Sequence, residues 1–156
     1  MYKALIRARI RRQIEQLNRG DYQPLLATAA PDAELAFPGD NSWSGQFRRP
    51  ERSRAQHTTH RGRAELEGFA RRFVAAGLQL QVDDILVNGP PWNLRVAVRA
   101  TDRALDVGGN EVYNNRVIAF IESRWGRIHR WEDYLDTERV AAWDRTLELA
   151  GQPAAS

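Results

Sequence analysis

The sequence GRIHRWEDYLDT spans residues 126–137 and decides the fold of this chain. It leaves a glycine turn, alternates with the period of a β-strand, and ends at Asp136 and Thr137, either of which can cap a following helix. The alternation places His129, Trp131 and Asp133 on one face of the strand. A carboxylate among large apolar side chains is costly to bury without a partner. Asp133 is therefore the candidate functional residue of this stretch.

Length and composition predict a single soluble domain. The 156 residues are enough to bury a core, and the chain contains no cysteine for disulfides or thiolate metal sites. We assign residues 1–150 to one domain and residues 151–156 to a flexible tail. No run approaches the roughly 18 apolar residues of a membrane span, and the first residues lack the apolar core of a signal peptide. We therefore expect a cytoplasmic protein without a membrane partner.

Arginines gather in residues 46–61, which we predict to be a loop insertion. This segment contains His57 and His60, whose spacing suits two metal ligands, but no third ligand lies nearby. We predict two solvated histidines and no metal site. The chain carries no helix-turn-helix, zinc or aromatic RNA-binding signature, and acidic residues are interspersed elsewhere. The arginine-rich segment is therefore expected to be a solvated face, and we expect no nucleic-acid partner.

Apolar residues repeat at helical spacing in three places. The predicted helices lie between residues 6 and 17, between residues 62 and 77, and after residue 137. A further short helix is predicted from Asp21 to Thr28, with Pro24 in its first turn. These stripes are expected to face the core.

Between residues 78 and 136 the period of the pattern falls to 2, which predicts four strands in an antiparallel meander. Turns at residues 88–91, 106–110 and 124–126 separate the strands, and Asp83-Asp84 interrupts the first strand with a bulge. A short earlier strand at residues 33–37 places Leu35 and Phe37 on one face. Helices segregated to one face of an antiparallel sheet give an α+β architecture.

The order of these elements resembles the nuclear-transport-factor-2-like fold, a cone-shaped, curved antiparallel sheet wrapped by helices and also known as a cystatin-like α+β roll. Ketosteroid isomerases, limonene epoxide hydrolases and SnoaL-like polyketide cyclases share this fold, and the local motifs are most similar to the SnoaL-like members. These motifs are FPGD at 37–40, SG at 44–45, GR at 62–63, YNNR at 113–116, GRI at 126–128 and DYLDT at 133–137. The resemblance implies a pocket between sheet and helices, and a homodimer formed through the outer face of the sheet.

The resemblance also places Asp133 at the position of the acidic acid/base residue of SnoaL-like cyclases and limonene epoxide hydrolases, with Arg95 beside it. Desolvation raises the pKa of such a carboxyl and a nearby arginine lowers it, which can leave a base usable near neutral pH. The alternative is that Asp133 and Arg95 form only a structural ion pair. The second Asp, the Tyr and the Asn of the epoxide hydrolases fall on Ala97, Leu35 and Phe37, which argues against that activity.

Seven side chains are predicted to line the pocket and contact a small apolar ligand. They are Trp131, Leu35, Phe37, Asn115, Tyr113, Trp43 and His129. His129 lies about 13 Å along the strand from Asp133, where a solvated position at the rim is favoured unless the ligand is large. Alternation leaves open whether Asn114 or Asn115 faces the helices. Trp43 and Phe47 lie in a loop that would either cover the pocket mouth or pack on the adjacent helix.

Two functions are consistent with this pattern. In the first, the protein is a cofactor-independent acid/base enzyme of the cyclase or isomerase type: Asp133 abstracts a proton next to a carbonyl, and Arg95 or an Asn stabilises the enolate. In the second, it is a non-catalytic ligand-binding or dimerisation module with the same cavity. Trp92 at a turn and Trp125 at a hairpin tip are candidate dimer contacts.

Overall fold

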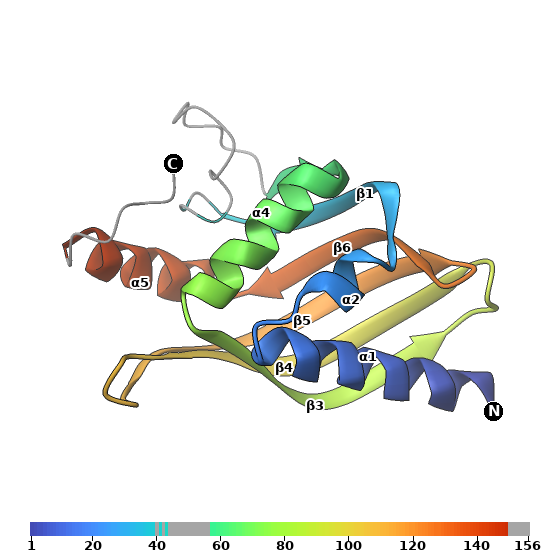
Figure 1. Ribbon diagram of the computed structural model, residues 1–156, viewed down its shortest axis with the longest axis horizontal. Helices are drawn as coiled ribbons and strands as arrows, with labels where there is room; N and C mark the ends of the chain where they lie inside the picture. The colour runs from blue at the N-terminus through green and yellow to red at the C-terminus, as the bar shows by residue number, and fades with distance from the viewer. Residues whose placement is uncertain (40, 42, 44–56, 150–156) are drawn as a thin grey trace.

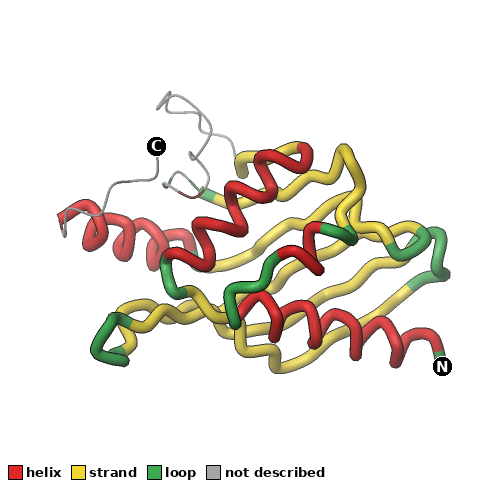
Figure 2. The backbone as a smooth tube through the Cα atoms, in the orientation of Figure 1, coloured by secondary structure: helices red, strands yellow, loops and turns green. Residues whose placement is uncertain are grey.

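A six-stranded curved sheet forms the body of the protein, and helices lie across one of its faces (Figure 1, Figure 2). The computed structural model describes residues 1–39, 41, 43 and 57–149. The helices are α1 (Tyr2–Asn18), α2 (Gln23–Leu26), α4 (Gly62–Ala75) and α5 (Thr137–Leu149). The strands are β1 (Ala29–Pro38), β2 (His57–Arg61), β3 (Leu78–Asn88), β4 (Leu94–Leu105), β5 (Glu111–Arg124) and β6 (Arg127–Leu135).

The predicted four-strand meander is confirmed. Strands β3, β4, β5 and β6 follow one another in the sheet as antiparallel neighbours, and the register shifts between Val82 and Asp84, where the bulge was predicted. The strand predicted at residues 33–37 is part of the longer β1, which runs parallel to β6. Beyond it β2 closes the strand order β2-β1-β6-β5-β4-β3.

The helices also lie where the apolar spacing places them. The side chain of Asp136 caps α5, because its Oδ1 accepts hydrogen bonds from the backbone N–H groups of Glu138 at 3.0 Å and Arg139 at 3.3 Å. The short α2 carries a proline in its first turn, and Asp21 accepts a hydrogen bond from the N–H of Gln23. No helix among the described residues is long and apolar enough to cross a membrane.

The interpretation of residues 46–61 as a loop is wrong for residues 57–61, which form β2 and pair with β1. His60 is not solvated either: it is only 1% exposed, and its Nε2 lies 3.0 Å from the carbonyl oxygen of Trp43. Pairing at the sheet edge buries this histidine against Phe69 of α4. Residues 46–56, including Phe47, lie outside the described residues. Among the described residues no group of three His, Asp or Glu side chains is placed to hold a metal ion.

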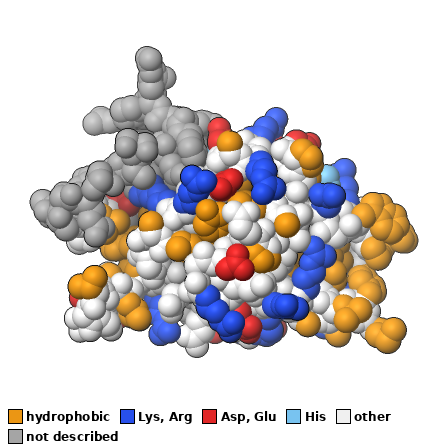
Figure 3. Space-filling view, viewed as in Figure 1, with side chains coloured by type: hydrophobic (Ala, Val, Ile, Leu, Met, Phe, Trp, Pro, Cys, Tyr) orange, Lys and Arg blue, Asp and Glu red, His pale blue; other side chains and the backbone are white. Residues whose placement is uncertain are grey.

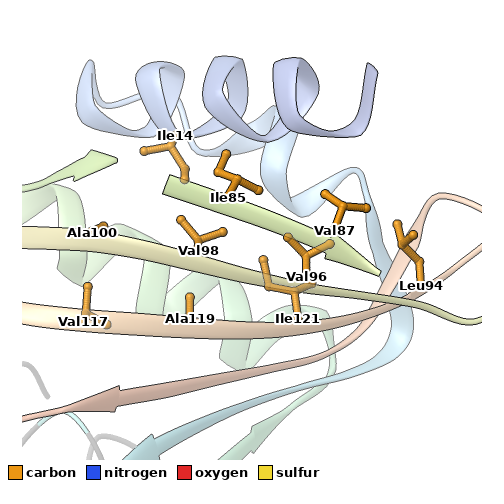
Figure 4. Packing of buried hydrophobic residues seen from close by; sticks show 10 residues of the cluster. All are labelled: Ile14, Ile85, Val87, Leu94, Val96, Val98, Ala100, Val117, Ala119 and Ile121. Carbon is orange, nitrogen blue, oxygen red and sulfur yellow. The ribbon is translucent and has the colours of Figure 1, made fainter. Parts of the chain in front are cut away.

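Two apolar clusters form the core. The first fills the space between α1 and strands β3, β4 and β5, where side chains on one face of the sheet point toward α1 (Figure 4). The second is rich in aromatic rings, among them Phe69 and Phe73 of α4 and Trp143 of α5.

Candidate ligand cavity and its two carboxyl groups

A mostly apolar cavity lies between the sheet and the helices. It encloses about 1100 Å³ of empty space, counted out to its open mouth, and every described helix and five of the strands contribute to its wall. The polar residues in this wall are Glu34, Asp102, Tyr113 and Asp133. The remaining lining residues are aliphatic or aromatic. The cavity can therefore hold an apolar molecule that carries a few polar groups.

The register of the sheet explains why the two aspartates reach this cavity. Val98, Ala119 and Asp133 lie side by side on β4, β5 and β6, in one row that crosses the inner face of the sheet. Figure 4 labels Val98 and Ala119, which stand on the face toward α1. Two steps beyond Ala100 on β4, Asp102 has the same parity as Val98 and therefore faces the same side.

Asp133 is held by its neighbour on the same strand face. The indole Nε1 of Trp131 donates a hydrogen bond of 2.7 Å to Oδ1 of Asp133. Burial raises the pKa of Asp133 to about 7, against the lowering effect of the Trp131 hydrogen bond, and the charge of Glu132 raises it further. A carboxyl group with this pKa is partly ionised at neutral pH and can exchange a proton with a ligand.

Asp102 is the second carboxyl group of the cavity, and the sequence-based reasoning missed it. Its residue is 8% exposed, and its Oδ1 has no hydrogen-bond partner among the described residues. Burial raises the pKa of Asp102 to about 8, the charge of Asp133 raises it further, and a hydrogen bond from the backbone of Arg103 lowers it. The signal was present in the sequence, because Asp102 is the next residue on the strand face that carries the apolar side chains up to Ala100.

Tyr113 brings a hydroxyl group to the same cavity. Its ring stacks on Trp143 with centroids 4.5 Å apart, and its Oη accepts a hydrogen bond of 3.1 Å from Nδ2 of Asn115. Burial raises the pKa of Tyr113, and the charge of Asp102 raises it further, so the hydroxyl stays protonated. The hydroxyl proton itself has no acceptor within the described part of the chain. It is free to be donated to a ligand.

The choice between Asn114 and Asn115 is resolved by the same contacts. Asn115 is buried and also donates a hydrogen bond of 2.8 Å to the carbonyl oxygen of Asp136. Asn114 instead donates to Glu111 at the exposed side of β5. Asn115 is not part of the cavity wall, so its structural place is behind Tyr113, where it fixes the hydroxyl and the start of α5.

The expectation that Arg95 lies beside Asp133 is wrong. Alternation along β4 turns Arg95 and Ala97 to the outer face, opposite to the buried Val96. The Arg95 side chain is 58% exposed, and its Nε lies 3.7 Å from a carboxylate oxygen of Glu122. The inner carboxyl group on β4 is thus Asp102, while Ala97 faces away from the cavity.

The prediction that His129 shares the cavity face with Trp131 and Asp133 is also wrong. Strand β6 contains a bulge at this point, and the period of the sequence does not reveal it. Glu122 pairs with Arg130 but the next residue of β5, Ser123, pairs with Ile128. His129 is the extra residue between these pairs, and Ile128 takes its place in the cavity wall.

Trp131, Leu35, Phe37 and Trp43 all lie in the cavity wall. Leu35 and Trp131 are neighbours across the parallel pair of β1 and β6. Trp43 is buried in the aromatic cluster: it stacks on Trp143 with centroids 5.9 Å apart, and the guanidinium of Arg72 lies 4.2 Å from its ring centroid. Trp43 therefore forms a fixed part of the cavity wall. Of the two alternatives for this residue, packing on the adjacent helices is the one observed.

Charge in the cavity is of one sign. None of the described residues that line it is Arg, Lys or His. The carboxylate of Glu34 is paired with Arg61 and Arg130, whereas Asp102 and Asp133 have no cationic partner among the residues that the structure describes. Elsewhere on the face seen in Figure 3, basic side chains are scattered among acidic and apolar ones.

Comparison with known proteins gives a sequence family and a set of similar structures. The sequence profile of the SnoaL-like domain matches residues 10–131. No curated protein matches the chain. A nuclear-transport-factor-2-like protein of unknown function from Burkholderia pseudomallei has a TM-score of 0.64 and 23% identity, covering 91% of this chain and 94% of that chain.

Two further similar structures have names that mention a ligand or an activity. TerC, co-crystallised with polyporic acid, has a TM-score of 0.63 and 20% identity, with 90% of this chain and 96% of that chain covered. A candidate polyketide cyclase from Xanthomonas campestris pv. campestris has a TM-score of 0.57 and 21% identity, with 87% and 93% covered. At these identities the structural similarity shows the fold, which agrees with the predicted nuclear-transport-factor-2-like architecture.

Proposed function

The chain belongs to the SnoaL-like domain family, and on that premise we propose that it is a cofactor-independent acid/base enzyme of the cyclase or isomerase type. Its substrate is a small, mostly apolar carbonyl compound that binds in the cavity. The observation that carries the proposal is Asp133, a carboxyl group in an apolar wall with a pKa of about 7. A base with this pKa is well matched to proton abstraction at neutral pH.

In the proposed reaction Asp133 removes a proton from the carbon next to the carbonyl group. Its Oδ1 is held by Trp131, so Oδ2 is the oxygen that takes the proton. The electron pair of the broken C–H bond moves into the carbonyl group and leaves an enolate oxygen. That enolate then either takes the proton back from Asp133 at another carbon, which is isomerisation, or attacks a second carbonyl carbon. The attack closes a ring and leaves an alkoxide oxygen, which takes the proton from Asp133.

Tyr113 is the proposed donor to the enolate oxygen in place of the expected Arg95. Asn115 holds its Oη at 3.1 Å, and the hydroxyl proton remains available to the ligand. A positioned donor stabilises the charge that develops in the transition state. The charge of Asp133 contributes to the raised pKa of Tyr113, which supports the view that both groups face one ligand.

The family and its structural neighbours support this choice of substrate class. One neighbour is named as a candidate polyketide cyclase, and another was crystallised with the small molecule polyporic acid. The non-catalytic alternative predicted a closed Asp133–Arg95 ion pair, and that pair is not formed, because Arg95 lies beside Glu122. We place the protein in the cytoplasm, and we propose no metal or other cofactor for it.

The test is deuterium exchange at a carbon acid. The probes are 1-indanone and 2-tetralone, whose exchange in D₂O is followed by NMR. The wild type is expected to accelerate exchange, and Asp133→Asn to remove about 100-fold or more of that acceleration while remaining folded. The exposed aspartate variant Asp32→Asn is the matched control and should retain the wild-type rate. Exchange catalysed equally by Asp133→Asn would exclude Asp133 as the base.

We also propose that the protein is a homodimer formed through the outer face of its sheet. Leu86, Ile118 and Tyr134 are 62%, 42% and 55% exposed on that face. Ile118 and Tyr134 are directly paired across β5 and β6, so they form a continuous apolar surface. The rings of Trp92 and Trp125 lie 5.7 Å apart at the end of the sheet and are the proposed edge of the contact.

A further inference from the structure

We propose that the cavity selects an apolar organic cation, a molecule whose rings or chain carry a protonated amine, and that Asp102 is the counter-ion of the ammonium group. This inference rests on the proposed binding of a small apolar ligand and adds the charge of that ligand. It concerns binding, so it does not depend on whether Asp133 turns the ligand over.

The first step is the balance of charge around the cavity. Its ionisable lining residues are acids, and none of the described lining residues is a base. Glu34 is neutralised by Arg61 and Arg130, so Asp102 and Asp133 are the lining carboxyl groups without a cationic partner in the described part of the chain. An anionic ligand would find no positively charged partner among the described lining residues, and it would oppose the ionisation of both carboxyl groups, because like charges repel strongly in an apolar surrounding. A cationic ligand would meet two partners.

The second step is the unsatisfied oxygen of Asp102. The residue is 8% exposed, lies in the cavity wall, and has an Oδ1 without a hydrogen-bond partner among the described residues. Asp133, by comparison, already accepts the hydrogen bond of Trp131. A buried polar atom without a partner costs free energy, and an ammonium group supplies both the missing donor and the opposite charge.

The third step is the aromatic wall. Rings of Trp43, Phe69, Tyr113 and Trp143 lie together along one side of the cavity. The faces of such rings attract organic cations, and the attraction is strongest for the ring of Trp. The protein uses this interaction itself, since the guanidinium of Arg72 lies 4.2 Å from the ring centroid of Trp43. The wall therefore favours the apolar part and the positive charge of the same molecule.

Binding of a cation has a consequence for protons. Burial and the charge of Asp133 raise the pKa of Asp102 to about 8, so this carboxyl group is mostly protonated at pH 7 when the cavity is empty. An ammonium group beside it lowers that pKa, and a proton must leave when the cation binds. The other titratable groups nearby are Tyr113, whose hydroxyl stays protonated and neutral, and Asp144, whose Oδ1 lies 3.9 Å from Nη2 of Arg72.

The experiment compares three probes with one carbon skeleton and different head groups. They are 4-phenylbutylamine, 4-phenylbutan-1-ol and 4-phenylbutyrate. Isothermal titration calorimetry at pH 7, repeated in phosphate and in Tris, gives the affinity and the number of protons released. We expect the amine to bind at least about tenfold more tightly than the alcohol, the carboxylate to bind most weakly, and amine binding alone to release a proton.

The variants separate the role of Asp102 from general binding. Asp102→Asn should bring the affinity for the amine down to that for the alcohol and abolish proton release, while the affinity for the alcohol stays the same. Asp32→Asn should behave like the wild type. Equal binding of amine and alcohol by the wild type, or a preference that survives in Asp102→Asn, would overturn the cation proposal and leave ligand binding standing. Failure of all three probes to bind would overturn both.

Discussion

Asp102 and Asp133 differ in what their oxygens contact. Asp133 accepts a hydrogen bond from Trp131, which opposes the effect of burial on its pKa. Oδ1 of Asp102 has no hydrogen-bond partner among the described residues, and the pKa of Asp102 is the higher of the two, at about 8 against about 7. Both groups keep their proton more readily than an exposed aspartate, because an apolar cavity stabilises the charged form poorly.

The first prediction follows from the sign of this shift. Between about pH 4 and pH 8 the folded protein holds a proton on Asp102 that the unfolded chain has released, so this residue makes the fold less stable as the pH rises. Asp102→Asn removes that cost. The melting temperature of Asp102→Asn relative to the wild type should therefore be higher at pH 8.5 than at pH 5.

Thermal unfolding followed by circular dichroism checks this prediction. Asp32→Asn, which changes an exposed carboxylate, is the control and should show the same small difference from the wild type at both pH values. A relative melting temperature of Asp102→Asn that does not change with pH would mean that Asp102 is ionised at its ordinary pKa in the folded protein.

At the residue scale, sequence reasoning selected Asp133 but not its surroundings. Its place on β6 was readable because a carboxylate stood among large apolar residues at period 2. Arg95 was assigned by resemblance, although alternation along the same strand turns it to the outer face. Asp102 was missed because the alternation was followed only as far as Ala100. A polar residue that continues an apolar face is the signal to look for.

Among the elements, Asn115 links β5 to the start of α5. Its Nδ2 donates both to Tyr113 on β5 and to the carbonyl oxygen of Asp136, just before α5. These two bonds use both hydrogens of the side-chain amide. Asn115 therefore couples the orientation of the Tyr113 hydroxyl to the start of the helix that carries Val140 and Trp143 into the cavity wall.

The second prediction concerns this residue. Asn115→Ala should lower the free energy of unfolding by about 1–3 kcal/mol, because it removes the buried hydrogen bond to Tyr113 and the part-buried hydrogen bond to the carbonyl oxygen of Asp136. Asn114→Ala is the matched control on the neighbouring position and should change stability by no more than about 0.5 kcal/mol. Urea unfolding measures both. Similar losses for the two variants would show that Asn115 has no special part in the fold.

The helices and the β3–β6 meander were predictable because each repeats an apolar period over many residues. The strand β2 and the bulge at His129 were not. Both depend on the neighbouring strand: β2 is defined by its pairing with β1, and the bulge by a register change opposite Ser123. A period within one segment carries no information about such a partner.

At the scale of the whole molecule, the two faces of the sheet differ in chemistry. The inner face holds the cavity. The outer face carries charged side chains, among them Arg95 of β4 and Glu122 of β5, which pair across neighbouring strands. The same face carries the apolar residues Leu86, Ile118 and Tyr134, which are proposed as the dimer contact. A second copy would cover it with an equivalent surface.

The third prediction is that the wild type sediments as a dimer at micromolar concentration. Ile118→Arg should sediment as a monomer, because it places two like charges in the centre of the contact and buries them without partners. Trp125→Ser changes an exposed ring at the hairpin tip, outside that centre, and should remain dimeric. A monomeric wild type, or a dimer that survives Ile118→Arg, would contradict this assignment of the outer face.

Two carboxyl groups with raised pKa values share the apolar cavity, and carboxyl ¹³C NMR measures both pKa values in the folded protein. The protein is labelled at the aspartate side-chain carboxyls, titrated from pH 3 to pH 10, and assigned with Asp102→Asn and Asp133→Asn. We expect a midpoint near pH 7 for Asp133 and near pH 8 for Asp102, and we expect the Asp133 midpoint to rise in Trp131→Phe. Midpoints near pH 4 for both residues would contradict it.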